Sequence, residues 1–450
     1  MSLTKKNLEE YEEVYGWGLY PRTKSIKKYP KNIDALRDLL SNKPAIARGN
    51  GRSYGDSSFN KSNTIEMLNF NRFLDFNEKT GLVTAEAGVL LEDVIKIFLP
   101  RGWFPNVTPG SKFVTLGGMI AANVHGKNHH KKGSFSNYIK WIEIMDDKGK
   151  IIRCCRKKNH NLFKWTIGGM GLTGIILKVA FYLKAVPTSW IKQKTLVAKN
   201  IYQTIELFES NINSTYLVAW IDCYSKGKNL GRSLITLGEH AAVKELDFNY
   251  QKKLFNIEKK KKISIPMHLP TYLLNNLSVR FFNYIYFLNG NISKKNKIVD
   301  WDNFFYPLDK ILNWNKIYGS RGFAQFQCVI PLHNSKKGIT ELLKCIANSN
   351  SSSFLAVLKR FGKQDSFFSF PMKGYSLALD FPINKRNLKL MNDLDKITLK
   401  YDGRFYLAKD SRMKKTIFQK SDNRIQNFKK YRKTKLKQIF SSIQSQRLGI

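Results

Sequence analysis

The chain has 450 residues, of which 42% are hydrophobic and 13% aromatic, which excludes a disordered or fibrous protein and leaves room for two domains. Its formal net charge of +42 permits nucleic acid or an anionic membrane as a partner, but abundant Lys, Asn, Ile and Phe also fit the compositional drift of an AT-rich genome. Its five cysteines include no C-x-x-C pair, which argues against a zinc site or disulfide framework and for reduced thiols in the cytoplasm.

No targeting or spanning segment is recognisable. Residues 1–10 are charged and carry no apolar signal region, and nowhere do about eighteen apolar residues follow one another. We therefore expect a cytoplasmic protein that neither crosses a membrane nor carries a signal peptide.

The first predicted elements alternate between helix and strand. Residues 32–40 have the apolar spacing of a helix, and residues 44–47 form a short β-type run. Strands over 68–75 and 81–87 and a helix over 90–98 continue the alternation. This order predicts an α+β domain.

Three glycine clusters interrupt these elements. The first, residues 47–56, has the spacing G-x-G-x-x-x-G and a Ser- and Asn-rich continuation, so it does not fit the Rossmann fingerprint. The second covers residues 108–130 and the third residues 167–176. Glycine turns bring backbone N–H groups close to an anion such as a phosphate, although a single one can equally be a surface turn.

A hairpin over 138–152 and a strand over 175–184 close the predicted first domain. From about residue 190 the strand-like segments 216–223, 323–331, 354–361 and 375–381 predict a second domain with an antiparallel sheet. Gln325 and Gln327 share one face of their strand, which faces either water or a cavity.

Residues 249–300 are the least regular part of the second domain. A lysine run at 259–262 stands beside apolar and aromatic residues at 263–288. Such a segment can dock on an anionic bilayer, or it can be a solvated loop over a buried helix.

The last segment, 401–450, contains the motif Ala408-Lys409-Asp410-Ser411-Arg412 and a basic helical stretch over 418–439. This motif, the first glycine cluster, His125 to His130 (HGKNHH) and Gly171 to Ile176 (GLTGII) closely resemble the decaprenylphosphoryl-β-D-ribose 2'-oxidase family. That family lies within the vanillyl-alcohol oxidase or PCMH-type FAD-binding flavoprotein superfamily. The resemblance runs over nearly the whole chain.

The resemblance implies a two-lobed PCMH-type FAD-binding domain over 1–189, a substrate-binding domain over 190–400, and a segment 401–450 that returns to the FAD domain. In the family, a lysine matching Lys409 lies between flavin and substrate, and His125 lies near the ring as a base or hydrogen-bond partner. The resemblance implies cofactor contacts at Arg48, Gly49, Asn50, Gly51, Arg52, Ser53, Tyr54, Gly110, Thr115, Gly117, Gly118, Ala122, Asn123, Gly126, Asn128, Gly171, Gly174, Ile175 and Tyr406.

On the substrate side the resemblance implies Gln325, Gln327, Lys359, Ser376 and Ala378. The implied reaction oxidises the 2'-hydroxyl of a lipid-linked ribose, a polyprenylphosphoryl-β-D-ribose, by hydride transfer to flavin N5. A short-chain dehydrogenase partner would then complete the epimerisation to the arabinose form. A lipid-linked substrate favours peripheral contact with an anionic membrane at the inner face of the plasma membrane.

Two alternatives stay open at this point. A sugar-lactone or alditol oxidase could use the same scaffold. A basic nucleic-acid-binding protein would also fit the charge, but no compact nucleic-acid module appears, so we expect no nucleic-acid partner.

Two positions depart from related patterns. Lactone oxidases with covalent flavin have a histidine directly before the serine of the first glycine loop; Arg52 stands there, so we expect non-covalent FAD. Mycobacterial members have an active-site cysteine where this chain has Ala378, so inhibitors that trap the cysteine should fail. His125, His129 and His130 lack a nearby Cys or carboxylate, and we expect no metal.

Overall fold

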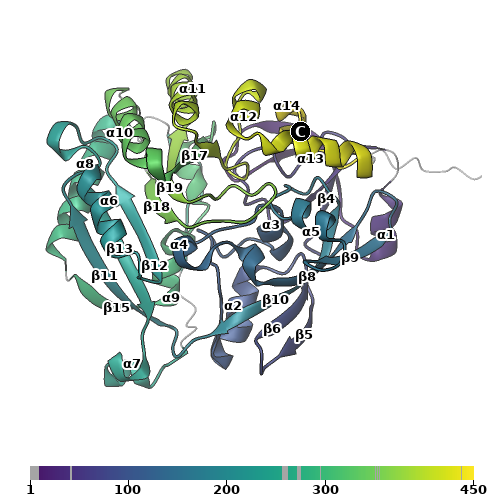
Figure 1. The fold of residues 1–450 in the computed structure, drawn as a ribbon, viewed down its shortest axis with the longest axis horizontal. Helices are drawn as coiled ribbons and strands as arrows, with labels where there is room; N and C mark the ends of the chain where they lie inside the picture. The colour runs from purple at the N-terminus through teal and green to yellow at the C-terminus, as the bar shows by residue number, and fades with distance from the viewer. Residues whose placement is uncertain are drawn as a thin grey trace, which may run out of the picture.

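The structure is a computed structural model that describes residues 10–450, apart from residues 41–42, 256–261, 271–274, 294, 350, 352, 354 and 437. It contains sheets of four, six and eight strands and a two-stranded pair. In Figure 1 the first two sheets lie to the right and the eight-stranded sheet to the left. Strand β10 (Ile175–Ala185) belongs to the six-stranded sheet and β11 (Trp190–Ala198) to the eight-stranded one.

The four-stranded sheet has the order β1-β2-β4-β3. Its strands β3 and β4 run parallel, and β3 leads directly into the first glycine cluster. Helix α1 (Ile33–Asp38) begins at Asn32, whose side chain accepts a hydrogen bond from the backbone N–H of Ala35 and so caps the helix. The strands are β1 (Tyr11–Tyr15), β2 (Arg22–Lys28), β3 (Ala45–Arg48) and β4 (Asn63–Glu66).

The six-stranded sheet has the order β5-β6-β10-β8-β9, with β7 also pairing with β10. The predicted hairpin is confirmed, because β8 and β9 pair antiparallel with Met145 opposite Ile151. The predicted strand over 68–75 starts only at Phe73, since residues 67–70 form a turn in which Phe70 N donates to Met67 O at 3.1 Å. The strands are β5 (Phe73–Asn77), β6 (Leu82–Glu86), β7 (Trp103–Pro105), β8 (Ile139–Met145) and β9 (Ile151–Cys155).

The eight-stranded sheet has the order β15-β11-β13-β12-β18-β19-β17-β20, and its neighbouring strands are antiparallel. The expected α+β class with an antiparallel second sheet is confirmed. Besides β11, its strands are β12 (Tyr216–Ile221), β13 (Ser233–His240), β15 (Asn296–Asp300), β17 (Phe323–Pro331), β18 (Ala356–Phe361), β19 (Gly374–Pro382) and β20 (Arg404–Phe405).

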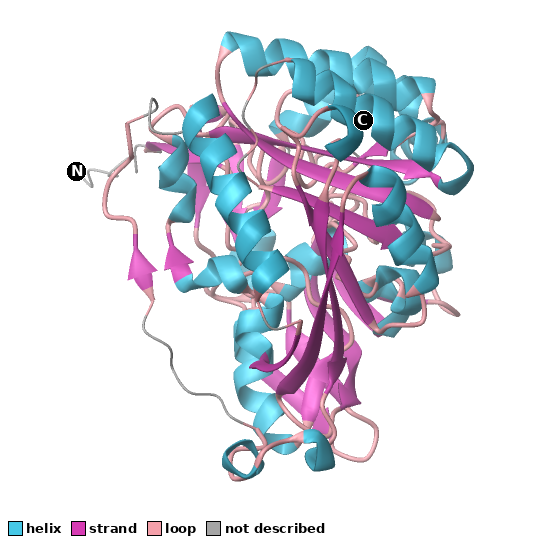
Figure 2. Ribbon diagram, turned by 90° about the vertical axis from the view of Figure 1, so that its left-hand side faces the viewer, coloured by secondary structure: helices cyan, strands magenta, loops and turns pink. Residues whose placement is uncertain are grey.

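The two faces of this sheet meet different neighbours. Helix α6 (Ile201–Ser210) lies on one face, where the Thr204 and Ser233 hydroxyls are 2.7 Å apart. Helix α8 (Asn276–Ile292) lies on the other, where Gly290 contacts the side chain of Leu234. Successive residues of a strand point to opposite faces, so even-numbered residues of β12 and β13 face α8. Figure 2 shows helices covering the sheets.

The remaining helices are short or flank the sheets. The stretch predicted as one helix over 418–439 is broken, because α12 ends at Ser421 and α13 begins at Arg424. The helices are α2 (Leu91–Phe98), α3 (Leu116–Ala121), α4 (His129–Lys132), α5 (His160–Thr166), α7 (Phe248–Gln251), α9 (Trp301–Phe305), α10 (Leu332–Asn348), α11 (Lys385–Lys400), α12 (Lys415–Ser421), α13 (Arg424–Lys435) and α14 (Ile443–Leu448), and the two-stranded pair is β14 (Ile263–Ser264) with β16 (Ile311–Leu312).

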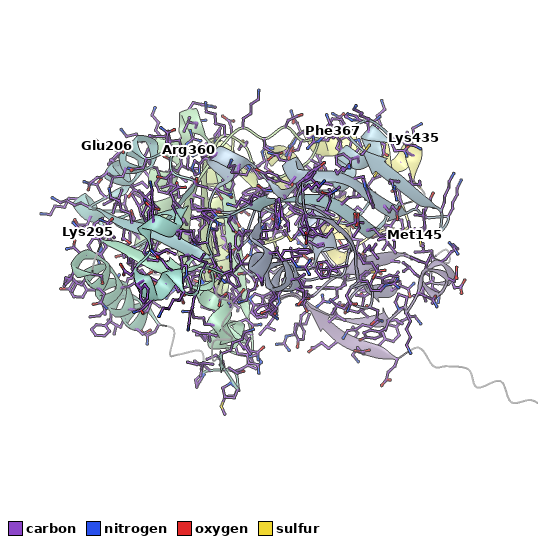
Figure 3. All side chains as sticks on the ribbon, turned by 90° about the horizontal axis from the view of Figure 1, so that it is seen from below. Met145, Glu206, Lys295, Arg360, Phe367 and Lys435 are labelled. Atoms are coloured by element: carbon purple, nitrogen blue, oxygen red, sulfur yellow. The ribbon has the colours of Figure 1, made fainter. Side chains whose placement is uncertain are left out.

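The last segment touches both halves of the molecule. Strand β20 pairs with β17 of the eight-stranded sheet, whereas Phe428 of α13 stacks on Trp165 with ring centroids 5.2 Å apart. Figure 3 places Lys435, at the end of α13, and Lys295 toward opposite ends of the molecule. Within the described part of the chain, no helix combines the length and the hydropathy that crossing a bilayer requires.

Candidate functional site

The structure brings the three glycine clusters together. Asn50 Nδ2 in the first donates a hydrogen bond to Phe113 O in the second at 2.8 Å. Met170 N in the third donates to Ala121 O, at the end of α3, at 2.9 Å. Three turns that are far apart in sequence therefore surround one region between the first two sheets.

In the first turn, the backbone rather than the side chains is available to a ligand. Gly51 has φ of +59°, a left-handed conformation that favours glycine. The side chain of Arg48 is already used, since its Nε lies 3.1 Å from Glu66 Oε1. A cavity of about 320 Å³ opens beside this turn, lined by Tyr29, Arg48, Gly49, Asn50, Gly51, Glu66, Leu68 and Asn69.

Arg52, Ser53 and Tyr54 continue this turn toward the second half of the molecule. The Arg52 guanidinium stacks 4.1 Å from the Trp17 ring, and its Nε has no partner. Ser53 O accepts from Trp17 N, and Tyr54 N donates to Ala408 O at 2.9 Å. The turn is thereby fixed against the segment that carries Lys409.

The second turn contains buried polar atoms without partners. Thr115 caps α3 by accepting a hydrogen bond from Gly118 N at 3.2 Å, and Gly117 N donates to Ala87 O. Thr108 Oγ1 and Asn128 Oδ1 are buried and unpaired; both residues contact Gly126, where a Cβ would lie 2.8 Å from Thr108 O. Buried polar groups normally have partners, so these atoms indicate a ligand.

Other predicted positions of the second turn differ in exposure. Gly110 and Gly118 are exposed at the rim. Asn123 is buried with both ends of its amide in use, because Nδ2 donates to Ser369 Oγ and Oδ1 accepts from Ser136 N. Its side chain therefore holds the loop of residues 362–373 in place, and only its backbone is available to a ligand.

The third turn supplies left-handed glycines, with φ of +78° at Gly171 and +147° at Gly174. The Ile175 side chain packs in the core of the four-stranded lobe, so only its backbone can meet a cofactor. Ala122 O accepts a hydrogen bond from Tyr406 OH at 3.2 Å. This hydrogen bond connects Tyr406, a predicted cofactor contact, to the end of α3.

His125 is buried among aromatic rings. Its Nε2 lies 3.3 Å from Gln327 Nε2, and an amide nitrogen can only donate, so His125 Nε2 accepts and Nδ1 carries the proton. That Nδ1 has no partner. Burial first, and then Lys359, hold the pKa of His125 well below its usual value. The ring is therefore neutral at pH 7 and is better suited to donating a hydrogen bond than to acting as a base.

Lys409 lies over the Tyr54 ring, with Nζ 3.4 Å from its centroid. The carboxylate of Asp380, which is buried, accepts a hydrogen bond from Gln325 Nε2, while its Oδ2 has no partner. Burial lowers the pKa of Lys409 and raises that of Asp380, and the charge of Asp380 raises the pKa of Lys409. Asp380 therefore acts on Lys409 through its charge, which favours the protonated amine.

The pairing register places the predicted substrate residues on one sheet face. In antiparallel pairs, directly opposite residues share a face. Gln325 is opposite Asp380, Gln327 is opposite Ala378, and Lys359 is opposite Ser376. Gln327 Nε2 also donates to Ser376 Oγ at 3.2 Å.

Three lysines approach this face. Burial lowers the pKa of Lys127 to about 7 and that of Lys359 to about 8, and Lys359 further lowers the pKa values of Lys127 and Lys409. Asp380 is a carboxylate whose charge acts on Lys409. Partly desolvated cations that repel one another are stabilised by an anion, so the pocket is suited to a negatively charged ligand.

His129 and His130, the other two histidines of the HGKNHH motif, form hydrogen bonds with other segments of the chain. His129 Nδ1 accepts from Gly362 N at 3.2 Å, and His130 Nε2 lies 2.7 Å from Ser214 O. Within the described residues, no group of three or more His, Cys, Asp or Glu side chains could hold a metal ion.

Two residues of this site had no role in the sequence prediction. Asp380 alternates with Ser376 and Ala378, so the period of two already placed it on their face. Lys127 lies two residues after His125 in the same motif. Its Nζ lies 4.5 Å over the Phe304 ring and donates to Phe304 O, a contact between distant segments that no local pattern indicates.

The sequence is similar to those of known proteins. Residues 28–155 match the family described as FAD binding domain. The chain is 34% identical to decaprenylphosphoryl-beta-D-ribose oxidase of Mycolicibacterium smegmatis over 86% of this chain and 85% of that protein. The chain belongs to the decaprenylphosphoryl-β-D-ribose oxidase family. It is also 25% identical to an uncharacterised protein of Streptomyces coelicolor over 80% of this chain and all of that protein, and 25% identical to bovine L-gulonolactone oxidase over 41% of this chain and 42% of that enzyme.

Membership of this family, within the PCMH-type flavoproteins, makes the chain an FAD-dependent oxidoreductase. The residues present fit the cofactor. The unpaired Thr108 Oγ1, Asn128 Oδ1 and Arg52 Nε are polar atoms that a dinucleotide can satisfy, and the glycine turns expose backbone where a diphosphate needs N–H donors.

Proposed function

We propose that this decaprenylphosphoryl-ribose oxidase homologue oxidises the 2'-hydroxyl of a polyprenylphosphoryl-β-D-ribose to the 2-keto sugar. The observation that carries the proposal is the group of Lys127, Lys359 and Lys409 beside a sheet face with two glutamines and a serine. Cations suit the phosphate of a lipid-linked sugar, and amide and hydroxyl groups suit sugar hydroxyls. A neutral lactone would leave these cations without a partner.

Bound FAD supplies the acceptor for the hydride that leaves the sugar carbon. A residue of the chain accepts the proton of the sugar hydroxyl. We assign Lys409, whose pKa burial lowers to about 7, to take the hydroxyl proton in its neutral form, so that the amine becomes cationic as the hydride leaves. The positive charge then left at Lys409 stabilises negative charge that develops beside it.

The neighbouring residues orient the sugar. Gln327 is held between His125 and Ser376, and Gln325 is held by Asp380. Both amides are thus fixed before a substrate arrives, which lowers the entropic cost of aligning the hydroxyl. The unpaired His125 Nδ1–H is available to a ligand oxygen.

The 2-keto product needs a reduction from the other face to reach the arabinose form. We propose a short-chain dehydrogenase partner for this step, because such enzymes carry hydride on a nicotinamide and return it to a ketone. The net epimerisation is then the sum of one oxidation and one reduction.

Anaerobic titration of the purified enzyme tests the substrate. Polyprenylphosphoryl-ribose should bleach the flavin absorbance, while a free sugar lactone and an alditol of matched concentration should leave it oxidised. If the lactone or alditol reduces the flavin and the lipid-linked sugar does not, the proposed substrate is wrong.

A further inference from the structure

Helix α8 has apolar residues on two sides. Its inner side meets the eight-stranded sheet, where Tyr286 packs against Trp220 with centroids 4.8 Å apart and the Asn283 amide donates to Asp222 Oδ1. Its outer side carries Leu277, Phe281, Tyr284, Ile285 and Ile292, of which Leu277, Phe281 and Ile292 are 77%, 69% and 80% exposed. The outer residues follow the helical spacing i, i+4, i+7, i+8, i+15 and form one stripe, called here the α8 stripe.

The segment that contains the α8 stripe is basic. Between Glu258 and Asp300 the sequence contains no acidic residue. Arg280 of the helix and Lys295 and Lys297, which follow it, are exposed. An exposed apolar stripe in a segment with exposed cations and no acidic residue has the composition of a helix that lies in the interface of an anionic bilayer.

The inner side of α8 is continuous with the candidate site. Val357 of β18 is opposite both Ala378 of the site and Trp220 of β12, so these three residues share the sheet face on which α8 lies. All three are partly exposed, whereas Leu358 and Ala219 on the opposite face are buried. A strip of accessible surface therefore runs from the sugar-binding residues to the inner side of α8.

We propose that the α8 stripe docks this enzyme on the surface of an anionic phospholipid bilayer. The proposal rests in part on the proposed function, because a polyprenyl-linked sugar is held in a bilayer and must reach the site from there. The strip through Val357 and Trp220 then gives the sugar of the lipid-linked substrate a path from the membrane to Lys409.

The positive charge of the chain favours a bilayer over a second copy of the chain as the partner of the α8 stripe. The chain carries a formal charge of +42, and the cations beside the α8 stripe would face each other across a symmetric interface. Like charges in contact are unfavourable, whereas anionic headgroups neutralise them. The bilayer is therefore the favoured partner.

Co-sedimentation of the holoenzyme with vesicles tests the proposal. Vesicles of phosphatidylcholine with added phosphatidylglycerol should bind the protein, and pure phosphatidylcholine vesicles should bind it more weakly. Phe281→Ser combined with Ile285→Ser should weaken binding at least about tenfold. Lys295→Gln combined with Lys297→Gln should weaken it about 20- to 30-fold at low salt.

A charge-matched control uses the opposite end of the molecule. Lys433→Gln combined with Lys435→Gln in α13 removes the same charge far from Lys295 (Figure 3) and should leave vesicle binding nearly unchanged. Equal losses in both lysine pairs, or full binding by the Phe281 and Ile285 variant, would overturn the proposal.

Two further readouts separate the outcomes. Analytical ultracentrifugation should find the wild type monomeric; a dimer that dissociates in the Phe281 and Ile285 variant would assign the α8 stripe to a second copy instead. Flavin reduction by detergent-dispersed substrate should be unchanged in the α8 variants. Vesicle binding needs no turnover, so its failure and the failure of the proposed substrate are seen in different experiments.

Discussion

Lys409 and Asp380 are two buried groups of the site whose pKa values have moved toward each other. The unperturbed pKa values of an amine and a carboxyl group differ by about six units. Here burial acts on both groups in opposite directions. The pair is held by Tyr54 below the amine and by Gln325 at the carboxylate, so its geometry does not depend on a bound sugar.

Replacement of Lys409 tests this pair directly. Lys409→Ala should slow substrate-dependent flavin reduction by about 10³-fold or more, because both the proton acceptor and the cation are lost. Bound FAD, measured by absorbance, should remain because the three glycine turns are intact. Lys414→Ala, at an exposed lysine five residues on, is the matched control and should react normally. Near-normal reduction by Lys409→Ala would remove this residue from the chemistry.

Asp380→Asn should change the pH dependence as well as the rate. The mechanism needs a neutral Lys409 to take the hydroxyl proton, so the wild-type rate should rise with pH through the pKa of Lys409, about 7. Asp380 raises this pKa; without it, Lys409 loses its proton at lower pH, and the rise should begin earlier. The maximal rate should fall about 10²-fold, because the cation that forms at Lys409 loses a stabilising charge. Stopped-flow reduction across pH measures this, with Asp365→Asn as an exposed control, and a rate that rises at the wild-type pH would contradict it.

At this scale the sequence predicted residues that lie within recognisable motifs. Gln325 and Gln327 were expected on one face, and the sheet register places them there. Asp380 was missed because nothing local marks it as functional; its importance comes from Lys409, which lies in a distant segment. Ion pairs and pKa shifts arise from such long-range contacts, which sequence spacing does not encode.

Among the elements, α14 connects the cofactor turn to the catalytic segment. Arg447 Nη2 lies 2.7 Å from Asp56 Oδ1 and 2.8 Å from Asp410 Oδ2. Asp56 ends the first glycine cluster, and Asp410 follows Lys409. One guanidinium therefore contacts two buried carboxylates and joins the two segments.

Arg447→Met should destabilise the protein by about 3–5 kcal/mol, because it leaves Asp56 buried without a counter-ion and removes one of the two cations that act on Asp410. Burial already raises the pKa of Asp56 in the folded state, and the variant should raise it further together with that of Asp410, so stability is lost at neutral pH and regained as pH falls through the raised pKa values. Thermal unfolding of the variant from pH 7 to pH 5 should show this recovery, together with weaker FAD retention. Arg101→Met, at an exposed arginine, should do neither; a loss of stability independent of pH would contradict the explanation.

The elements that the sequence predicted well have strong local signals, such as the apolar periodicity of α2 and the hairpin of β8 and β9. The apolar periodicity of the segment 249–300 was weaker. Helix α8 has apolar residues around much of its circumference, so no single periodic face stood out, and its exposed side became evident only from its contacts. The break between α12 and α13 lies at Asp422, whose backbone is extended and whose side chain accepts a hydrogen bond from Arg424 N.

Across the whole molecule, the site is built from segments that only the complete fold brings together. Turns of the first domain surround one side, the eight-stranded sheet supplies the other, and the last segment inserts Lys409 between them. A dinucleotide that touches all three turns should therefore stabilise the entire protein rather than one lobe.

This stabilisation can be measured because we expect FAD to dissociate. Arg52 occupies the position where covalent relatives have histidine and stacks on Trp17, so acid should release the flavin into the supernatant. FAD returned to the apoprotein at a hundredfold excess over Kd should stabilise it by about 2.7 kcal/mol, seen as a higher Tm by calorimetry. Riboflavin, which lacks the diphosphate, should raise Tm much less, because the three turns are inferred to bind that group. Equal shifts with both compounds would mean that the turns do not bind the diphosphate, and flavin that stays with acid-denatured protein would mean that attachment is covalent.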